Sequence, residues 1–326
     1  MSAHGPSVRT MRYLANVVAI TALVAGAAAP AAGQALFQSQ RLTPPGEYTG
    51  GIEGPAVDAA GALYVVNFGT AGTIGRVAPS ATSSTLFAKL PGGSIGNGIR
   101  FDRDGRMYVA DFKKHNVFVL EPGGTVPRVY FHSGQFHQPN DLAIAADGTL
   151  YASDPNFPGR TGRIWRITRG TDGKGSGEIM TSDRAMGVTN GLDLSPDGGT
   201  LYVSESNTRE VWAYRLDGAK LASPRLVRRF PVPASGPKPE LDGLRTDADG
   251  RIFVTRPLNG TVAVLPPDGT LVREVALRGK EPTNLTFGGP DGKTVYVTQR
   301  DGRFIETFRT DRPGREPCLQ GVTAAC

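Results

Sequence analysis

The chain has 326 residues, of which 43 are Gly and 25 are Pro, and 39% of its residues are hydrophobic. This composition indicates many turns around an ample core and excludes a disordered chain. The formal net charge of +6 is spread along the sequence, and because the one dense basic stretch, Arg225 to Arg229, lacks stacking aromatics, we expect no nucleic-acid partner.

The first 35 residues differ in kind from the rest. Arg9 and Arg12 precede an apolar stretch over residues 17–29, and small residues follow Pro30. This order is typical of a secretory signal peptide, and the stretch is shorter than the ~20 residues of a spanning helix. We therefore expect an exported periplasmic or extracellular protein without a stable membrane anchor, a membrane anchor being the alternative. This segment contains two Arg and no acidic residue, so its removal would lower the net charge of the chain from +6 to +4.

Six strand-turn-strand units follow, each with a polar residue 11 or 12 positions before an aromatic. The aromatics are separated by 44, 43, 51, 51 and 43 residues. The polar residues are Glu53, Asn97, Asn140, Asn190, Asp242 and Asn284, and their aromatics are Tyr64, Tyr108, Tyr151, Tyr202, Phe253 and Tyr296.

A period in the forties with several short alternating strands per repeat is typical of propeller blades. The sequence therefore predicts an all-β, six-bladed β-propeller with a central channel over residues 36–312, followed by a tail over residues 313–326. Because the innermost strand of each blade lines the channel, the six polar side chains should converge there. Residues 36–42 alternate apolar and polar, and we expect them to form the outermost strand of the last blade and so to remove its free edge.

Four of the converging residues are candidate ligands for a metal. Glu53 and Asp242 supply carboxylates, whereas Asn140 and Asn190 supply amide oxygens. Hard oxygen ligands with a formal charge of minus two favour one divalent cation, most naturally Ca²⁺, with Zn²⁺ or Mg²⁺ as alternatives. Taken singly, each Asn or Asp could instead begin a strand with an Asx turn.

With these motifs in order, the chain resembles the SMP-30/gluconolactonase/LRE-like family of six-bladed propellers over residues 34–312. The resemblance rests on Glu53-Gly54-Pro55, Asn97-Gly98-Ile99, Asn140-Asp141, Asn190-Gly191-Leu192-Asp193, Asp242-Gly243 and Asn284-Leu285-Thr286-Phe287-Gly288-Gly289. It implies one catalytic metal held by Glu53, Asn140, Asn190 and Asp242, with Asn97 and Asn284 as supporting or substrate-contacting groups. It also implies that the substrate is a small-molecule lactone, typically of a sugar acid.

Two positions depart from the pattern of the family. Gln138 stands where members with sugar-lactone activity often have arginine, and Ala56-Val57 stands where many have an aromatic. Neither change should affect metal binding. They leave the identity of the substrate open.

The same site suggests a mechanism for opening a lactone. A cation would polarise the carbonyl while a nearby water attacks it, with Asp242 as the base or water-orienting group and Glu53 as a ligand. The converse assignment stays open. His137, three residues before Asn140, could contact substrate or carry a proton, or could simply be an imidazole in a loop.

Two other motifs carry no chemistry in this interpretation. The sequence Gly92-Gly93-Ser94-Ile95-Gly96 matches G-x-S-x-G, but no helix follows, so we expect a loop. Cys318 and Cys326 in the tail are expected to form a disulfide. Three functional classes remain: a metal-dependent lactonase, a related phosphotriesterase-type hydrolase, and an exported binding or scaffold propeller. The oligomeric state is not indicated.

Overall fold

The computed structural model describes residues 1–3, 5, 35–232 and 241–323. The chain divides into two units, residues 1–33 and 34–326, and the fold belongs to the second. The predicted signal peptide lies almost wholly outside the described residues. In the part of the chain that is described, no helix is long and apolar enough to cross a membrane.

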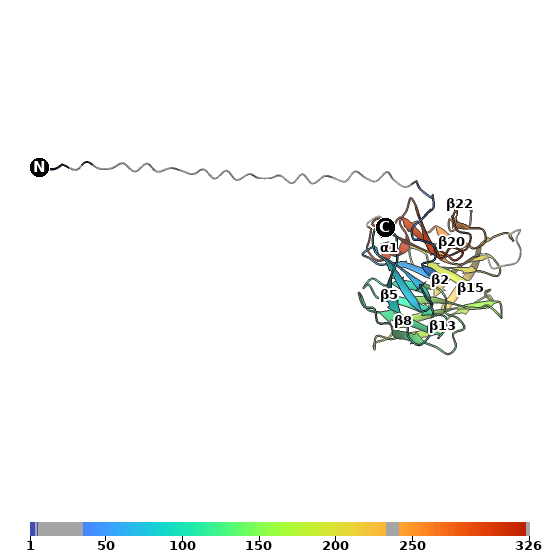
Figure 1. Ribbon diagram of the computed structural model, residues 1–326. Coiled ribbons are helices and arrows are strands. Elements are labelled where there is room, and N and C mark those ends of the chain that lie inside the picture. The colour runs from blue at the N-terminus through green and yellow to red at the C-terminus, as the bar shows by residue number, and fades with distance from the viewer. Residues whose placement is uncertain (4, 6–34, 233–240, 324–326) are drawn as a thin grey trace. The chain divides into compact units, whose positions relative to one another are not determined.

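The strands of the second unit form six sheets, which follow one another in chain order (Figure 1). Each sheet is a blade, and the innermost strands of consecutive blades touch, from β2 and β6 around to β23 and back to β2. This closed ring confirms the predicted all-β, six-bladed β-propeller. For the ring to close, each blade must have two apolar faces, one packed against the preceding blade and one against the following blade.

The first three blades are each four-stranded and antiparallel. Blade 1 contains β2 (Tyr48–Val57), β3 (Leu63–Phe68), β4 (Thr73–Val77) and β5 (Thr85–Lys89). Blade 2 contains β6 (Gly96–Phe101), β7 (Met107–Asp111), β8 (Asn116–Leu120) and β9 (Arg128–His132). Blade 3 contains β10 (Leu142–Ile144), β11 (Leu150–Asn156), β12 (Thr161–Arg169) and β13 (Gly175–Ile179).

The last three blades vary the pattern at their outer edges. Blade 4 contains β15 (Thr189–Leu194), β16 (Thr200–Glu205), β17 (Glu210–Asp217) and β18 (Lys220–Arg229), with the short β14 (Thr181–Ser182) parallel to β18. Blade 5 contains β19 (Leu244–Thr246), β20 (Ile252–Arg256), β21 (Thr261–Leu265) and β22 (Arg273–Ala276). Blade 6 contains β23 (Pro282–Gly288), β24 (Thr294–Gln299), β25 (Phe304–Arg309) and β1 (Gln40–Arg41).

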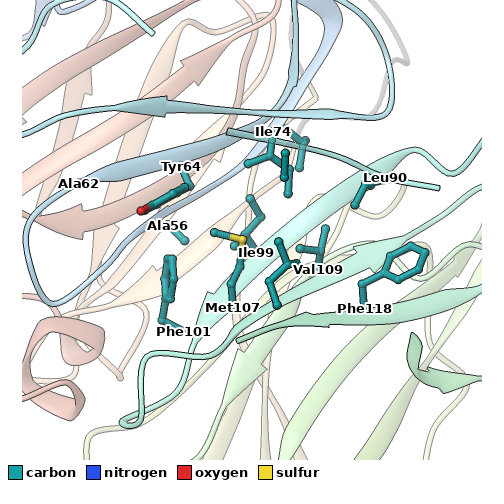
Figure 2. Packing of buried hydrophobic residues seen from close by; sticks show 13 residues of the cluster. Ala56, Ala62, Tyr64, Ile74, Leu90, Ile99, Phe101, Met107, Val109 and Phe118 are labelled. Atoms are coloured by element: carbon teal, nitrogen blue, oxygen red, sulfur yellow. The ribbon is translucent and has the colours of Figure 1, made fainter. Parts of the chain in front are cut away.

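The repeated aromatics explain how the blades adhere. Tyr64 packs between blades 1 and 2, where its ring lies 5.3 Å from that of Phe101 between centroids, and it shares a buried cluster with Ile99, Met107 and Phe118 (Figure 2). Each of the other five repeat aromatics contacts a different cluster of this kind. Because burying such a side chain stabilises a fold by about 1.5–3 kcal/mol, the sequence period marks the contacts that hold the ring together.

Blade 6 closes the ring with the N-terminal strand. Gln40 pairs with Thr307 and Arg41 with Glu306, so β1 is the outermost strand beside β25. The amide of Phe37 also donates to the carbonyl of Arg309 at 2.7 Å. The predicted role of residues 36–42 is confirmed, since blade 6 would otherwise end at β25 with an unpaired edge.

The tail expected over residues 313–326 is packed against the propeller as far as it is described. It contains the helix α1 (Arg315–Leu319), whose first three residues are buried and which contacts β23. Cys318 lies in α1, whereas Cys326, its predicted disulfide partner, lies outside the described residues.

Candidate functional site

Irregularities in strand pairing direct polar side chains of the innermost strands into the channel. The register shifts on both sides of Glu53 in β2 and between Thr189 and Leu192, on either side of Asn190, in β15. Such bulges turn a side chain out of the regular pleat. Asn140 and Asp242 lie two residues before β10 and β19, so all four reach the same end of the channel.

Glycines after these residues let adjacent blades approach closely. Gly54 has a φ of 54°, and a Cβ there would lie 1.7 Å from the carbonyl oxygen of Asn97. Gly243 would likewise place a Cβ 2.2 Å from Oδ1 of Asn284. The backbone also bonds directly across this gap, as Gly243 N donates to Thr283 O at 2.8 Å. The Glu-Gly and Asp-Gly pairs in the sequence therefore reflect the crowding around the channel.

A cavity of about 640 Å³ opens at this end of the channel. Its lining includes all four predicted metal ligands, which come from blades 1, 3, 4 and 5: Glu53, Asn140, Asn190 and Asp242. Asn97 from blade 2 lines it as well. The side chains predicted to converge from these five blades thus face one volume.

The two carboxylates at the floor of the cavity are buried and close enough to repel each other. Burial is the main influence that raises the pKa of Glu53, against hydrogen bonds from Gly54 N at 2.9 Å and Asn284 Nδ2 at 3.0 Å. Burial also raises the pKa of Asp242 well above its ordinary value, and the negative charge of Glu53 adds to this effect. Arg300 is the cation beside Asp242, but its Nη2 is 3.9 Å from Oδ2 and its side chain is 47% exposed.

The donors around these carboxylates fit a hard divalent cation. Oδ1 of Asn190 is buried without a hydrogen-bond partner, while its Nδ2 donates to Ser206 Oγ at 3.0 Å and so fixes the amide. Oδ1 of Asn97 is buried and unpartnered too. Within the described residues no group of three or more His, Cys, Asp or Glu side chains could hold a metal, so a site here must combine carboxylates with amide oxygens.

Two predicted substrate-contacting residues lie outside the cavity lining. Asn284 is fully buried, and its amide donates to Glu53 Oε2 at 3.0 Å and to Asp141 Oδ2 at 3.3 Å. His137 is exposed, and its backbone amide donates to Asp154 Oδ1 at 2.8 Å. Asn284 therefore takes the supporting position that the sequence left open, because it orients a carboxylate from behind, and His137 lies on the adjoining loop. Substrate contact by either residue stays a prediction.

Sequence reasoning missed a buried ionic cluster directly beneath Glu53. Asp141 is fully buried and accepts from Arg245 twice, at 2.8 and 3.0 Å, and from Arg100 Nη2 at 2.9 Å. Burial is the main influence on Asp141 and raises its pKa to about 7, against the opposing charge of Arg100. The sequence held a sign of this cluster, because Arg100 and Arg245 each stand three residues after the polar residue of their unit, inside a buried strand.

The helix α1 completes this cluster at the far end of the channel. Glu316 Oε1 forms an ion pair with Arg100 Nε at 2.7 Å, and Arg315 Nη2 donates to Asp193 Oδ1 at 2.6 Å. Asp193, too, is three residues after the polar residue of its unit. The buried side chains of this cluster thus occupy the channel beneath Glu53, on the side away from the cavity.

Comparisons with known proteins agree with this geometry. Residues 52–300 match the model of the SMP-30/Gluconolactonase/LRE-like region. A gluconolactonase from Zymomonas mobilis is 27% identical over 62% of this chain, which spans 60% of that relative. A diisopropyl-fluorophosphatase from Loligo vulgaris is 26% identical over 82% of this chain and 91% of its own length.

A solved structure supports the fold alone. The calcium-binding protein regucalcin from Agrobacterium tumefaciens superimposes with a TM-score of 0.65 at 19% identity, covering 84% of this chain and 97% of the other. The family match, in contrast, reaches into all six blades and includes every polar residue of the repeats. The chain belongs to the SMP-30/gluconolactonase/LRE-like family.

Proposed function

We propose that this protein is a divalent-cation-dependent lactonase. The observation that carries the proposal is the pair of buried carboxylates, Glu53 and Asp242, which share a cavity with the unpartnered amide oxygen of Asn190. Buried charges of one sign need a compensating charge, and oxygen donors favour Ca²⁺ among the common divalent cations. Membership of a family that includes gluconolactonases supports the same chemistry.

A bound cation would polarise the lactone carbonyl and make an attacking water more acidic. The residues around it differ in how firmly they are held. Oε2 of Glu53 accepts two hydrogen bonds, from Gly54 and Asn284, which suits a fixed ligand. The carboxylate of Asp242 has the amide of Asn190 beside it and a long contact with Arg300 Nη2 at 3.9 Å, which suits a carboxylate that orients water and accepts its proton.

A second candidate is a phosphotriesterase-type hydrolase. The diisopropyl-fluorophosphatase matches this chain over nearly its whole length, whereas the gluconolactonase match spans 60% of that relative. A cation in the same cavity would stabilise the negative charge on a phosphoryl oxygen as it would on a carbonyl oxygen. The donor set therefore suits both reactions, and substrate must separate them.

The test is a turnover screen with the protein stripped of metal and then reloaded. Aldonolactones, acyl-homoserine lactones and organophosphates should be assayed with calcium and with chelator. We expect calcium-dependent opening of at least one lactone, lost in Glu53→Gln and kept in Glu121→Gln, which alters an exposed carboxylate. Turnover of organophosphates alone would favour the second candidate, and no turnover with metal bound would favour a binding propeller.

We also propose that the protein is exported. The support is the order of Arg9, Arg12, the apolar stretch over residues 17–29 and the small residues after Pro30, which is typical of a signal peptide. Expression of the full chain in a bacterium with an outer membrane, followed by N-terminal sequencing of the periplasmic fraction, tests it. Recovery of uncleaved protein from the cytoplasm would contradict the proposal.

A further inference from the structure

We propose that the cavity takes a lactone with an apolar substituent in preference to a polyhydroxylated one. The inference deepens the lactonase proposed above and rests on it. It follows from the distribution of side chains over the walls of the cavity. The floor carries the oxygen donors, the wall formed by blades 2 and 3 is largely apolar, and blade 6, across the channel from blade 3, contributes charged side chains.

The apolar wall comes from two adjacent blades. Ile95 precedes β6 and Phe112 follows β7, both in blade 2, and the amide of Phe112 donates to the carbonyl of Ile95 at 3.2 Å. Phe157 follows β11 in blade 3. All three line the cavity, and Phe157 is 42% exposed. A partly exposed phenyl ring inside a cavity gains free energy when an apolar group covers it.

Leu258 adds an apolar group from blade 5 in a conformation that does not suit leucine. Its φ is 71°, in the left-handed region that favours glycine or asparagine. Its amide donates to the carbonyl of Lys280 at 2.8 Å, which holds the loop, and the residue lines the cavity. Strained residues of this kind gather at functional sites, so the isobutyl group fits a role in contacting a ligand.

Two polar side chains of the cavity are already hydrogen-bonded within the protein. The amide of Asn67 donates to Gly51 O at 2.6 Å and accepts from Gly72 N at 3.1 Å. Ser206 donates to Leu241 O at 2.6 Å and accepts from Asn190. Hydroxyl groups of a sugar lactone would find no free partner in these two side chains, and an unpaired hydroxyl that leaves water costs free energy.

Charged groups stand on the blade opposite Phe157. Arg300 follows β24 in blade 6, and its amide donates to the carbonyl of Glu281 at 2.9 Å. Both residues line the cavity. In a ring of six blades, blade 6 lies across the channel from blade 3, so a substrate meets polar groups on one side and phenyl rings on the other. An ester group near the floor with an alkyl chain toward Phe157 satisfies both sides.

Lactams test this preference without requiring turnover, because they have the shape of lactones and resist hydrolysis. Calorimetry on the calcium-loaded protein should compare a plain six-membered lactam, the same ring with two- and four-carbon alkyl chains, and a polyhydroxylated lactam. Burial of alkyl chains predicts affinity that rises about fourfold per methylene until the wall is covered. The hydroxylated lactam should bind more weakly than any alkyl derivative.

Variants assign the preference to the wall. Phe157→Ala should lose most of the increase with chain length, whereas Leu86→Ala, which removes an exposed apolar side chain on β5, should keep it. Tighter binding of the hydroxylated lactam, an unchanged increase in Phe157→Ala, or no lactam binding would overturn the inference. Matching lactones assayed in parallel separate the two proposals: alkyl lactams that bind while no lactone opens would refute the lactonase and leave the apolar preference standing.

Discussion

The two ends of the channel contain the same kinds of buried side chain in different balance. At the closed end three guanidinium groups meet three carboxylates: Arg100, Arg245 and Arg315, with Asp141, Asp193 and Glu316. At the open end Glu53 and Asp242 face one cavity, and the cation beside them, Arg300, is half exposed. A cluster with equal numbers of positive and negative side chains can stabilise the fold by itself, whereas a cluster with excess negative charge needs a bound cation to compensate it.

Asn284 connects the two ends by hydrogen bonds. Its amide contacts Glu53 at 3.0 Å and Asp141 at 3.3 Å, so the closed end helps to fix the orientation of a proposed ligand. The two ends should nevertheless respond differently to mutation. Changes at the open end should affect metal binding and turnover, and changes at the closed end should mainly affect the free energy of unfolding.

The largest effect is expected from Asp242→Asn. The change keeps the size and an oxygen donor but removes the charge and the basicity, so lactonase turnover at saturating calcium should fall ~100-fold to 10,000-fold. Steady-state rates with purified protein measure it. Ser94→Ala is the control, because Ser94 is buried in the loop before β6 and does not line the cavity. A loss within a fewfold for Asp242→Asn, or inactive but folded Ser94→Ala, would place the chemistry elsewhere.

Arg100→Met should cause the next largest effect, and on stability. It leaves Glu316 without its ion pair and Asp141 with one guanidinium fewer, and breaking a buried pair costs about 3–5 kcal/mol. The melting temperature should fall by roughly 6 °C or more, while calcium still binds. Arg128→Met is the matched control, because its ion pair with Glu121 is exposed and contributes at most about 1 kcal/mol. Equal melting temperatures for the two variants would contradict the contrast between the ends.

Removal of the cation should have a smaller but reversible effect. A ligand present at 100 times its dissociation constant stabilises the folded protein by about 2.7 kcal/mol, which a chelator should abolish and calcium restore. Glu53→Gln and Asn190→Ala should weaken this response, because each removes or reduces a donor to the cavity. Metal analysis after dialysis, together with thermal melts, measures both. A metal-free wild type that is folded and fully active would end the metal hypothesis.

The sequence predicted the open end better than the closed end for a physical reason. Each repeat carries a polar residue at a fixed distance from an aromatic that packs between blades, so a period in the sequence becomes a ring in space. Arg100 and Asp193 share that phase, but their partners Arg315 and Glu316 lie in α1, outside the repeat. Contacts between a repeat and a non-repeated segment leave no period to detect, so the role of the tail required the structure.

The same limit explains why the sequence left the positions of Asn284 and His137 open. Phase in the repeat indicates which end of the channel a residue occupies, but not its depth, and Asn284 lies behind Glu53 rather than beside it. Position near a ligand in sequence was the reason to expect His137 in the site. The loop before β10 instead directs it to the surface.

Per pH unit, the smallest effect on stability is expected from pH, and it sharpens the contrast at the open end. Burial raises the pKa values of Glu53 and Asp242 in the metal-free protein, and the negative charge of Glu53 raises that of Asp242 further. The folded state therefore binds a proton more tightly than the unfolded chain, and this stabilisation is present at low pH and lost as pH rises from about 4 through the raised pKa values. One proton shared by the pair gives a slope of about 1.4 kcal/mol per pH unit at most. Melts between pH 4.5 and 8 in chelator should show it as a difference between wild type and Asp242→Asn, with exposed Asp104→Asn as control. Calcium should reverse the trend because it favours both ionised carboxylates. Parallel curves of stability against pH for wild type and Asp242→Asn would mean that the two carboxylates do not share a proton.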